Sequence, residues 1–131
     1  MLTLIISGGV LLLFFLPVPA GMLVEPLHWF TGHFLHWTGQ HLFWDVLMFV
    51  MLGWILEVHS RRLFIKVVVS SAVVISCVVP LLQPELIAYR GLSGIDSALF
   101  AAVLMLHIQQ TLRRRQFCVF SLTLLLAALF A

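Results

Sequence analysis

The chain has 131 residues, of which 63% are hydrophobic and only 9% are charged. Ordinary soluble domains carry about 25% charged residues, so this composition excludes a soluble globular protein. The balance of 7 basic against 5 acidic side chains is too even to indicate nucleic acid as a partner. Long apolar runs are what the hydrocarbon core of a bilayer selects, and the sequence therefore predicts an all-α, polytopic membrane helical bundle that forms a single domain, residues 1–131.

Five apolar segments are the predicted membrane spans, and they cover approximately residues 2–16, 42–56, 63–82, 91–108 and 117–131. A helix of about 15 residues is about 22 Å long, which is shorter than a bilayer core. The second and fifth spans therefore cross the membrane only if polar flanking residues join the helix or the bilayer is thin.

Residues 1–20 allow a second interpretation, in which they form a signal peptide that is removed. The small residues Val18-Pro19-Ala20 resemble a cleavage site. The positively charged segment that begins such peptides is missing, which favours a retained first helix.

Basic residues predict the orientation of the spans. Segments 61–66 and 113–115 each contain three of them, and both segments fall between predicted spans on the same side of the membrane. The positive-inside rule makes that side cytoplasmic. We therefore expect a cytoplasmic N-terminus, with segments 17–40 and 83–90 on the outer side.

Polar side chains inside a membrane are costly and mark functional sites. His41 and Asp45 are one helical turn apart at the outer end of the second span, so the carboxylate can pair with the imidazole. The same topology places Ser93 and Gly94 at the outer end of the fourth span. The two groups are therefore expected at the same depth in the membrane.

The segment Gly91-Leu92-Ser93-Gly94 is suited to mounting a serine nucleophile. Its glycines allow a tight turn into a helix, which leaves the Ser93 hydroxyl where free backbone N–H groups favour a developing negative charge. These four residues alone equally describe an ordinary helix entrance capped by Ser93.

These segments resemble the rhomboid family of intramembrane serine proteases. Residues 30–45, followed by Gly53 and Glu57, are similar to the family's first loop and second helix, where two His precede a polar residue one turn on. The segment 91–94 is similar to its nucleophile motif. The forms HLFWD and YRGLSGID are most like the short bacterial branch known as rhombosortases.

The resemblance implies that Ser93 is the nucleophile and that His41 and Asp45 stabilise the oxyanion. The vicinity of the substrate and oxyanion implied by the same motifs comprises Gly91, Gly94 and His36. The family's common residue at position 45 is Asn, and an ionised Asp45 would repel an oxyanion. Either burial keeps Asp45 protonated, or it holds His41 as an imidazolium that donates to the oxyanion, and the one-turn spacing favours the second.

The resemblance identifies no general base in this chain. The family takes that His from a helix after the serine helix, and His107 lies 14 residues beyond Ser93, about 21 Å along a helix axis. The apolar ending 124–131 favours a truncated form of a longer protease over a degenerate copy.

The implied function is cleavage of a single-span membrane protein near the outer face of a bacterial inner membrane, without a cofactor or a metal. One alternative is a catalytically inactive rhomboid-like protein that binds membrane segments. Another is a membrane metal or haem protein, because the spacings within His33, His36, His41 and Asp45 can converge on a metal.

Overall fold

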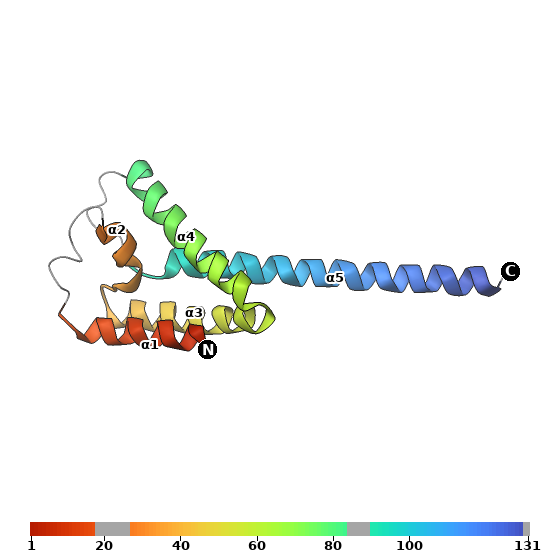
Figure 1. Ribbon diagram of the computed structural model, residues 1–131, viewed down its shortest axis with the longest axis horizontal. Coiled ribbons are helices and arrows are strands. Elements are labelled where there is room, and N and C mark those ends of the chain that lie inside the picture. Colours follow the sequence, from red (N-terminus) through yellow and green to blue (C-terminus); the bar gives the residue numbers. More distant parts are fainter. Residues whose placement is uncertain (18–26, 84–89, 130–131) are drawn as a thin grey trace.

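The computed structural model describes residues 1–17, 27–83 and 90–129 (Figure 1). The regular elements in these ranges are α1 (Leu2–Phe15), α2 (Leu27–Thr31), the 3₁₀ helix η2 (Gly32–Phe34), α3 (Gly39–His59), α4 (Arg61–Leu82) and α5 (Ser93–Leu129). The described part of the chain contains no strand, and the all-α class predicted from composition is confirmed.

Three helices are long and apolar enough to cross a membrane: α3, α4 and the Ser93–Phe117 part of α5. The fourth apolar helix, α1, has 14 residues and is shorter than a full span. Large apolar side chains are exposed along all four helices. Lipid is the environment in which such surfaces are stable, so this chain is an integral membrane protein.

Helices α1 and α3 are antiparallel neighbours (Figure 1). The Glu57 carboxylate in the last turn of α3 accepts hydrogen bonds from the N–H of Leu2 at 2.7 Å, and from the N–H and hydroxyl of Thr3 at 2.9 and 2.6 Å. The first turn of a helix has no internal acceptors for its N–H groups, so Glu57 caps α1. At the other end, the Phe14 ring lies against Gly39.

Helices α1, α3 and α4 meet at Gly53. A Cβ atom at this position would lie 2.9 Å from the Thr3 methyl group and 3.1 Å from the Phe64 ring. Phe64 also packs edge-to-face against Phe49 in the buried core. A residue without a side chain is therefore required for this close approach.

A single residue, Ser60, joins α3 to α4. Its backbone ends α3, and its hydroxyl accepts a hydrogen bond from the N–H of Leu63 at 3.3 Å to cap α4. The observed helices extend the predicted spans 42–56 and 63–82 at their polar ends, to Gly39–His59 and Arg61–Leu82. The polar flanks thus join α3, as a full crossing requires.

The predicted break between spans 91–108 and 117–131 is wrong. Both lie in the 37-residue helix α5, which passes without interruption through Arg113, Arg114 and Arg115. Gln, Leu and Arg are good helix formers, and the segment contains neither Gly nor Pro to end the helix. The arginines therefore mark a change in polarity along the helix and not a loop.

Candidate active site

Three groups converge on one oxygen atom of Asp45. Its Oδ2 lies 2.8 Å from the backbone nitrogen of Leu92, 3.1 Å from Nε2 of His36 and 3.2 Å from Nε2 of His41. Asp45 lies in α3, and Leu92 directly precedes the first residue of α5. The carboxylate therefore ties the serine segment to the two histidines.

The two histidines are placed by different local structures. His36 follows η2, and its side chain is fully buried. His41 lies in the first turn of α3, where its N–H donates to the hydroxyl of the N-cap residue Thr38 at 3.1 Å. The rings meet edge-to-face with centroids 5.2 Å apart. A carboxylate oxygen can only accept, so Nε2 of His36 is assigned as the donor of the hydrogen bond to Asp45. Nε2 of His41 is an ion-pair partner of the same oxygen when its imidazole is protonated.

Gly91 fits against this cluster because it lacks a side chain. Its φ of +124° is a conformation that other residues rarely adopt, and a Cβ atom there would lie 2.8 Å from Cε1 of His41 and 2.9 Å from Oδ2 of Asp45. Its N–H donates to the carbonyl oxygen of Gly32 at 3.0 Å. The serine segment is thus held between η2, which contains Gly32, and α3.

Ser93 is the first residue of α5 and is exposed, whereas Gly94 is half-buried. The hydroxyl therefore sits at a helix N-terminus, in the position that the sequence predicts. Within the part of the chain that the structure describes, no hydrogen bond joins this hydroxyl to a histidine. The Ser93 carbonyl accepts from the hydroxyl of Ser97 at 2.9 Å.

Sequence reasoning assigned no role to two groups beside this cluster. The first is the Leu92 N–H, which a side-chain pattern cannot reveal. The second is Asp96, which is as buried as Asp45, at 7% exposed. The Oδ1 atom of Asp96 has no hydrogen-bond partner among the described residues. Asp96 lies one helical turn after Leu92, whose carbonyl accepts a hydrogen bond from the Asp96 N–H at 2.9 Å. This one-turn spacing is the feature of the sequence that could have revealed Asp96.

A family model described as Rhomboid domain matches residues 24–131. The chain belongs to the rhomboid family. Members of this family are serine intramembrane peptidases. No curated protein and no solved structure matches the chain.

Two further histidines of this rhomboid chain, His33 and His107, have different surroundings, and of the two, His33 lies against the backbone of Gly91 in the serine segment. His33 is buried, and its Nε2 lies 3.3 Å from the Ala72 carbonyl oxygen and 3.2 Å from the Ser76 hydroxyl on α4. Burial lowers the pKa of His33 from its ordinary 6.5. His107 is exposed on α5, where the neighbouring residues Leu106 and Gln109 line a hollow together with His59, which lies at the far end of α3 from His41.

The metal alternative requires that the histidines which suggested it form a common ligand group. The described residues contain no group of three or more His, Cys, Asp or Glu side chains arranged to hold a metal ion. Nε2 of both His36 and His41 is directed at Asp45, and Nε2 of His33 is directed at α4. The Nε2 atoms that the spacing suggested as metal ligands are thus directed at Asp45 and at α4.

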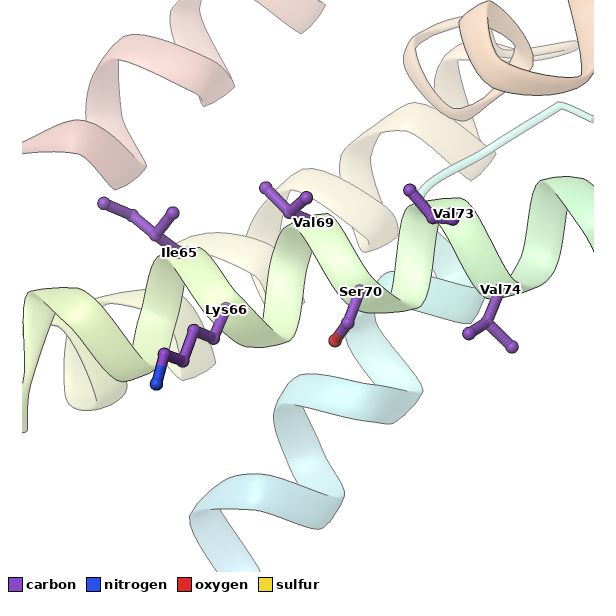
Figure 2. A pocket seen from close by; sticks show the side chains of 6 residues that line it. All are labelled: Ile65, Lys66, Val69, Ser70, Val73 and Val74. Atoms are coloured by element: carbon purple, nitrogen blue, oxygen red, sulfur yellow. The ribbon is translucent and has the colours of Figure 1, made fainter.

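A shallow apolar hollow lies along α4, far in sequence from the serine segment (Figure 2). Ile65, Val69 and Val73 project from one side of the helix, and Lys66 and Ser70 project from an adjoining side. Its lining residues all belong to α4 and include none of the Asp45 cluster. We assign this face to lipid contact.

Proposed function

We propose that this chain is a rhomboid intramembrane serine endopeptidase of the rhombosortase type, with Ser93 as its nucleophile. The observation that supports the proposal is the convergence of Leu92, His36 and His41 on Asp45, directly beside an exposed serine at a helix N-terminus. Family membership and this geometry point to the same chemistry.

In the proposed reaction the Ser93 hydroxyl attacks the carbonyl carbon of a peptide bond. The carbonyl oxygen becomes an oxyanion, which the N-terminus of α5 and the His41 imidazole stabilise by donating hydrogen bonds. The Ser93 proton passes to the leaving amine through a base that the described residues do not identify. Water then hydrolyses the acyl-enzyme and restores Ser93.

The proposed substrate is a single-span membrane protein that is cut near the outer face of the bacterial inner membrane. Arg90 lies beside the serine, with its guanidinium 4.0 Å from the centroid of the exposed Trp37 ring. Stacking of this kind holds a cation at an aromatic face. It places a positive charge and an aromatic side chain next to the serine segment, where a substrate would approach.

The nucleophile can be tested with a fluorophosphonate probe on the purified chain in detergent, with the adduct located by mass spectrometry. We expect the probe to label Ser93 slowly, because the described residues supply no base to its hydroxyl, and we expect Ser93→Ala to abolish this labelling. Ser97→Ala is the matched control, because Ser97 is also exposed and lies one turn further along α5. Labelling that survives Ser93→Ala, or that never reaches Ser93, would contradict the proposal.

A second function is favoured by one observation. The Ser93 hydroxyl has no base hydrogen-bonded to it within the described residues, and a serine needs an adjacent base to become a strong nucleophile. A non-catalytic rhomboid chain that binds membrane segments fits this arrangement. It predicts no Ser93 adduct, together with retention of single-span membrane proteins that is unchanged by Ser93→Ala.

A further inference from the structure

The single oxygen Oδ2 of Asp45 accepts hydrogen bonds from the Leu92 N–H at 2.8 Å and from Nε2 of His36 at 3.1 Å. Nε2 of His41, its ion-pair partner one turn earlier in α3, lies 3.2 Å from the same oxygen. Two hydrogen-bond donors and an imidazole from three separate segments thus meet at one point and form a site for one negatively charged oxygen. In the resting structure the occupant of that site is a side chain of the protein itself.

This arrangement matches what an oxyanion site requires. Such a site presents fixed donors about 2.7 to 3.1 Å from the position that the oxyanion will take. The Leu92 and His36 distances of 2.8 and 3.1 Å fall within this range, and the His41 distance of 3.2 Å lies just beyond it. The donors also lie directly beside Ser93, since Leu92 precedes it in the chain.

The chemical identity of residue 45 decides which group faces the donors. A neutral amide at this position offers both a donor and an acceptor, whereas a carboxylate offers acceptors only. Asp45 is 7% exposed, so its charge is compensated by these donors and not by water. A second negative oxygen cannot enter while the carboxylate remains, because two adjacent anions repel each other in a buried site.

We propose that the Asp45 carboxylate occupies the oxyanion site of the resting protein, so that the carbonyl oxygen of a substrate must displace it from Leu92, His36 and His41. This rests on the proposed serine-peptidase function for its catalytic meaning, but the anion site itself does not. The ligand class of that site is a single anionic oxygen, as carried by a carboxylate or a tetrahedral oxyanion.

Entry to the site is open on one side. The His41 side chain is 34% exposed, whereas the His36 side chain is fully buried. Gly91 covers the cluster with backbone alone, since its Cα carries no side chain over His41. A displacing oxygen would therefore approach past His41.

The anion site can be tested without any activity, by refilling it. Asp45→Ala removes the carboxylate and leaves the Leu92 N–H, His36 and His41 around a space of its size. We expect about 100 mM formate to raise the Tm of Asp45→Ala in detergent by about 3 to 5 °C relative to chloride at equal ionic strength, because a ligand that binds only the folded state stabilises it.

Asp96→Ala is the matched control for this measurement. Asp96 has the same exposure of 7%, but its Oδ1 has no described hydrogen-bond partner, so removing its carboxylate leaves no ring of donors. Formate should leave the Tm of Asp96→Ala and of the unaltered chain unchanged. An equal response in all three proteins, or none in Asp45→Ala, would overturn the anion site.

The resting occupancy is tested by the rate of Ser93 labelling. Asp45→Asn keeps the size of the side chain and removes its charge, so we expect the fluorophosphonate to label Ser93 at least about tenfold faster than in the unaltered chain, the scale of an oxyanion contact. A slower or unchanged rate would show that the carboxylate does not block the site.

If Ser93 is labelled in no variant, the peptidase function fails, and the formate measurement alone decides the anion site. If Asp45→Ala does not fold, the Asp45→Asn rate decides.

Discussion

At the scale of single residues, the site depends on a glycine as much as on its polar side chains. Gly91 combines a φ of +124° with atoms of His41 and Asp45 at 2.8 and 2.9 Å from where a Cβ would stand. A side chain there would force the serine segment away from α3. Leu92 would then lose its hydrogen bond to Asp45, and the donors would no longer converge.

We therefore expect Gly91→Ala to lower the free energy of unfolding by about 1 to 3 kcal/mol, the cost of holding a residue in a disfavoured backbone conformation. It should also abolish fluorophosphonate labelling of Ser93. Gly8→Ala is the control, because nothing lies within 4 Å of its Cβ position on α1. That variant should keep or slightly raise the stability, as Ala favours helix over Gly. Equal stability of the two variants in a denaturant titration would show that Gly91 is not constrained.

The residue scale also shows what sequence can and cannot predict. The one-turn spacing of His41 and Asp45 predicts their pairing, and the structure contains it at 3.2 Å. The spacing cannot predict that the same carboxylate also binds His36 and the Leu92 N–H. Those contacts depend on how a loop folds over α3 and on a backbone group, neither of which leaves a periodic pattern.

At the scale of elements, the segment that carries His36 is anchored to α4 by His33. Nε2 of His33 faces the Ala72 carbonyl and the Ser76 hydroxyl, and Ser76 in turn donates to the Trp29 carbonyl at 3.1 Å. Because burial lowers the pKa of His33, the folded state holds its imidazole neutral, and the unfolded state binds a proton more readily. The anchor therefore stabilises the fold fully above the ordinary pKa of 6.5 and loses its contribution as the pH falls below that value.

We expect the Tm in detergent to fall between about pH 7 and pH 5, with His33 contributing at most about 1.4 kcal/mol per pH unit to the slope of stability. His33→Gln should reduce this slope, since a neutral amide can still donate to Ala72 without titrating. His59→Gln is the control, because His59 is exposed at the end of α3 and should leave the slope unchanged. An identical slope in His33→Gln and the unaltered chain would exclude this role for His33.

Element boundaries were predictable where helix chemistry and membrane chemistry agree. Pro17 follows α1, and Ser60 supplies the cap that separates α3 from α4, so residue types in the sequence predict these helix ends. The boundary predicted near residues 109–116 relied on charge alone. Charge reports the membrane surface, whereas only a cap, a Gly or a Pro reports the end of a helix, so the sequence placed a loop inside α5.

At the scale of the whole molecule, the long helix α5 relates the site to the membrane. Ser93 is its first residue, and Arg113 follows 20 residues later, about 30 Å along the axis and close to the thickness of a bilayer core. Figure 1 shows the other helices gathered around the N-terminal part of α5, while its C-terminal part extends beyond them. His59 and Arg113 line one hollow, so the end of α3 and the arginines of α5 lie at one level.

The same end of the bundle holds the start of α1, because Glu57 caps Leu2 and Thr3 there. By the positive-inside rule we propose that this end, with Arg61 and Arg62, faces the cytoplasm. Ser93 lies at the opposite end of α5, which the same proposal assigns to the outer face. The proposed cleavage at the outer face therefore depends on the proposed cytoplasmic N-terminus, and a test of one is a test of the other.

This orientation can be tested with single cysteines in a chain whose Cys77 and Cys118 are replaced by Ala. His59 and Gln83 flank α4 at its two ends, and both are exposed. In intact spheroplasts, a membrane-impermeant thiol reagent should label Gln83→Cys and spare His59→Cys, and both should react once the membrane is permeabilised. The reverse pattern would put Ser93 at the cytoplasmic face, and labelling of both cysteines in intact cells would mean that α4 does not cross the membrane. Because Ser93 and His59 belong to opposite ends of one packed bundle, this pair of cysteines decides the side on which any substrate must be cut.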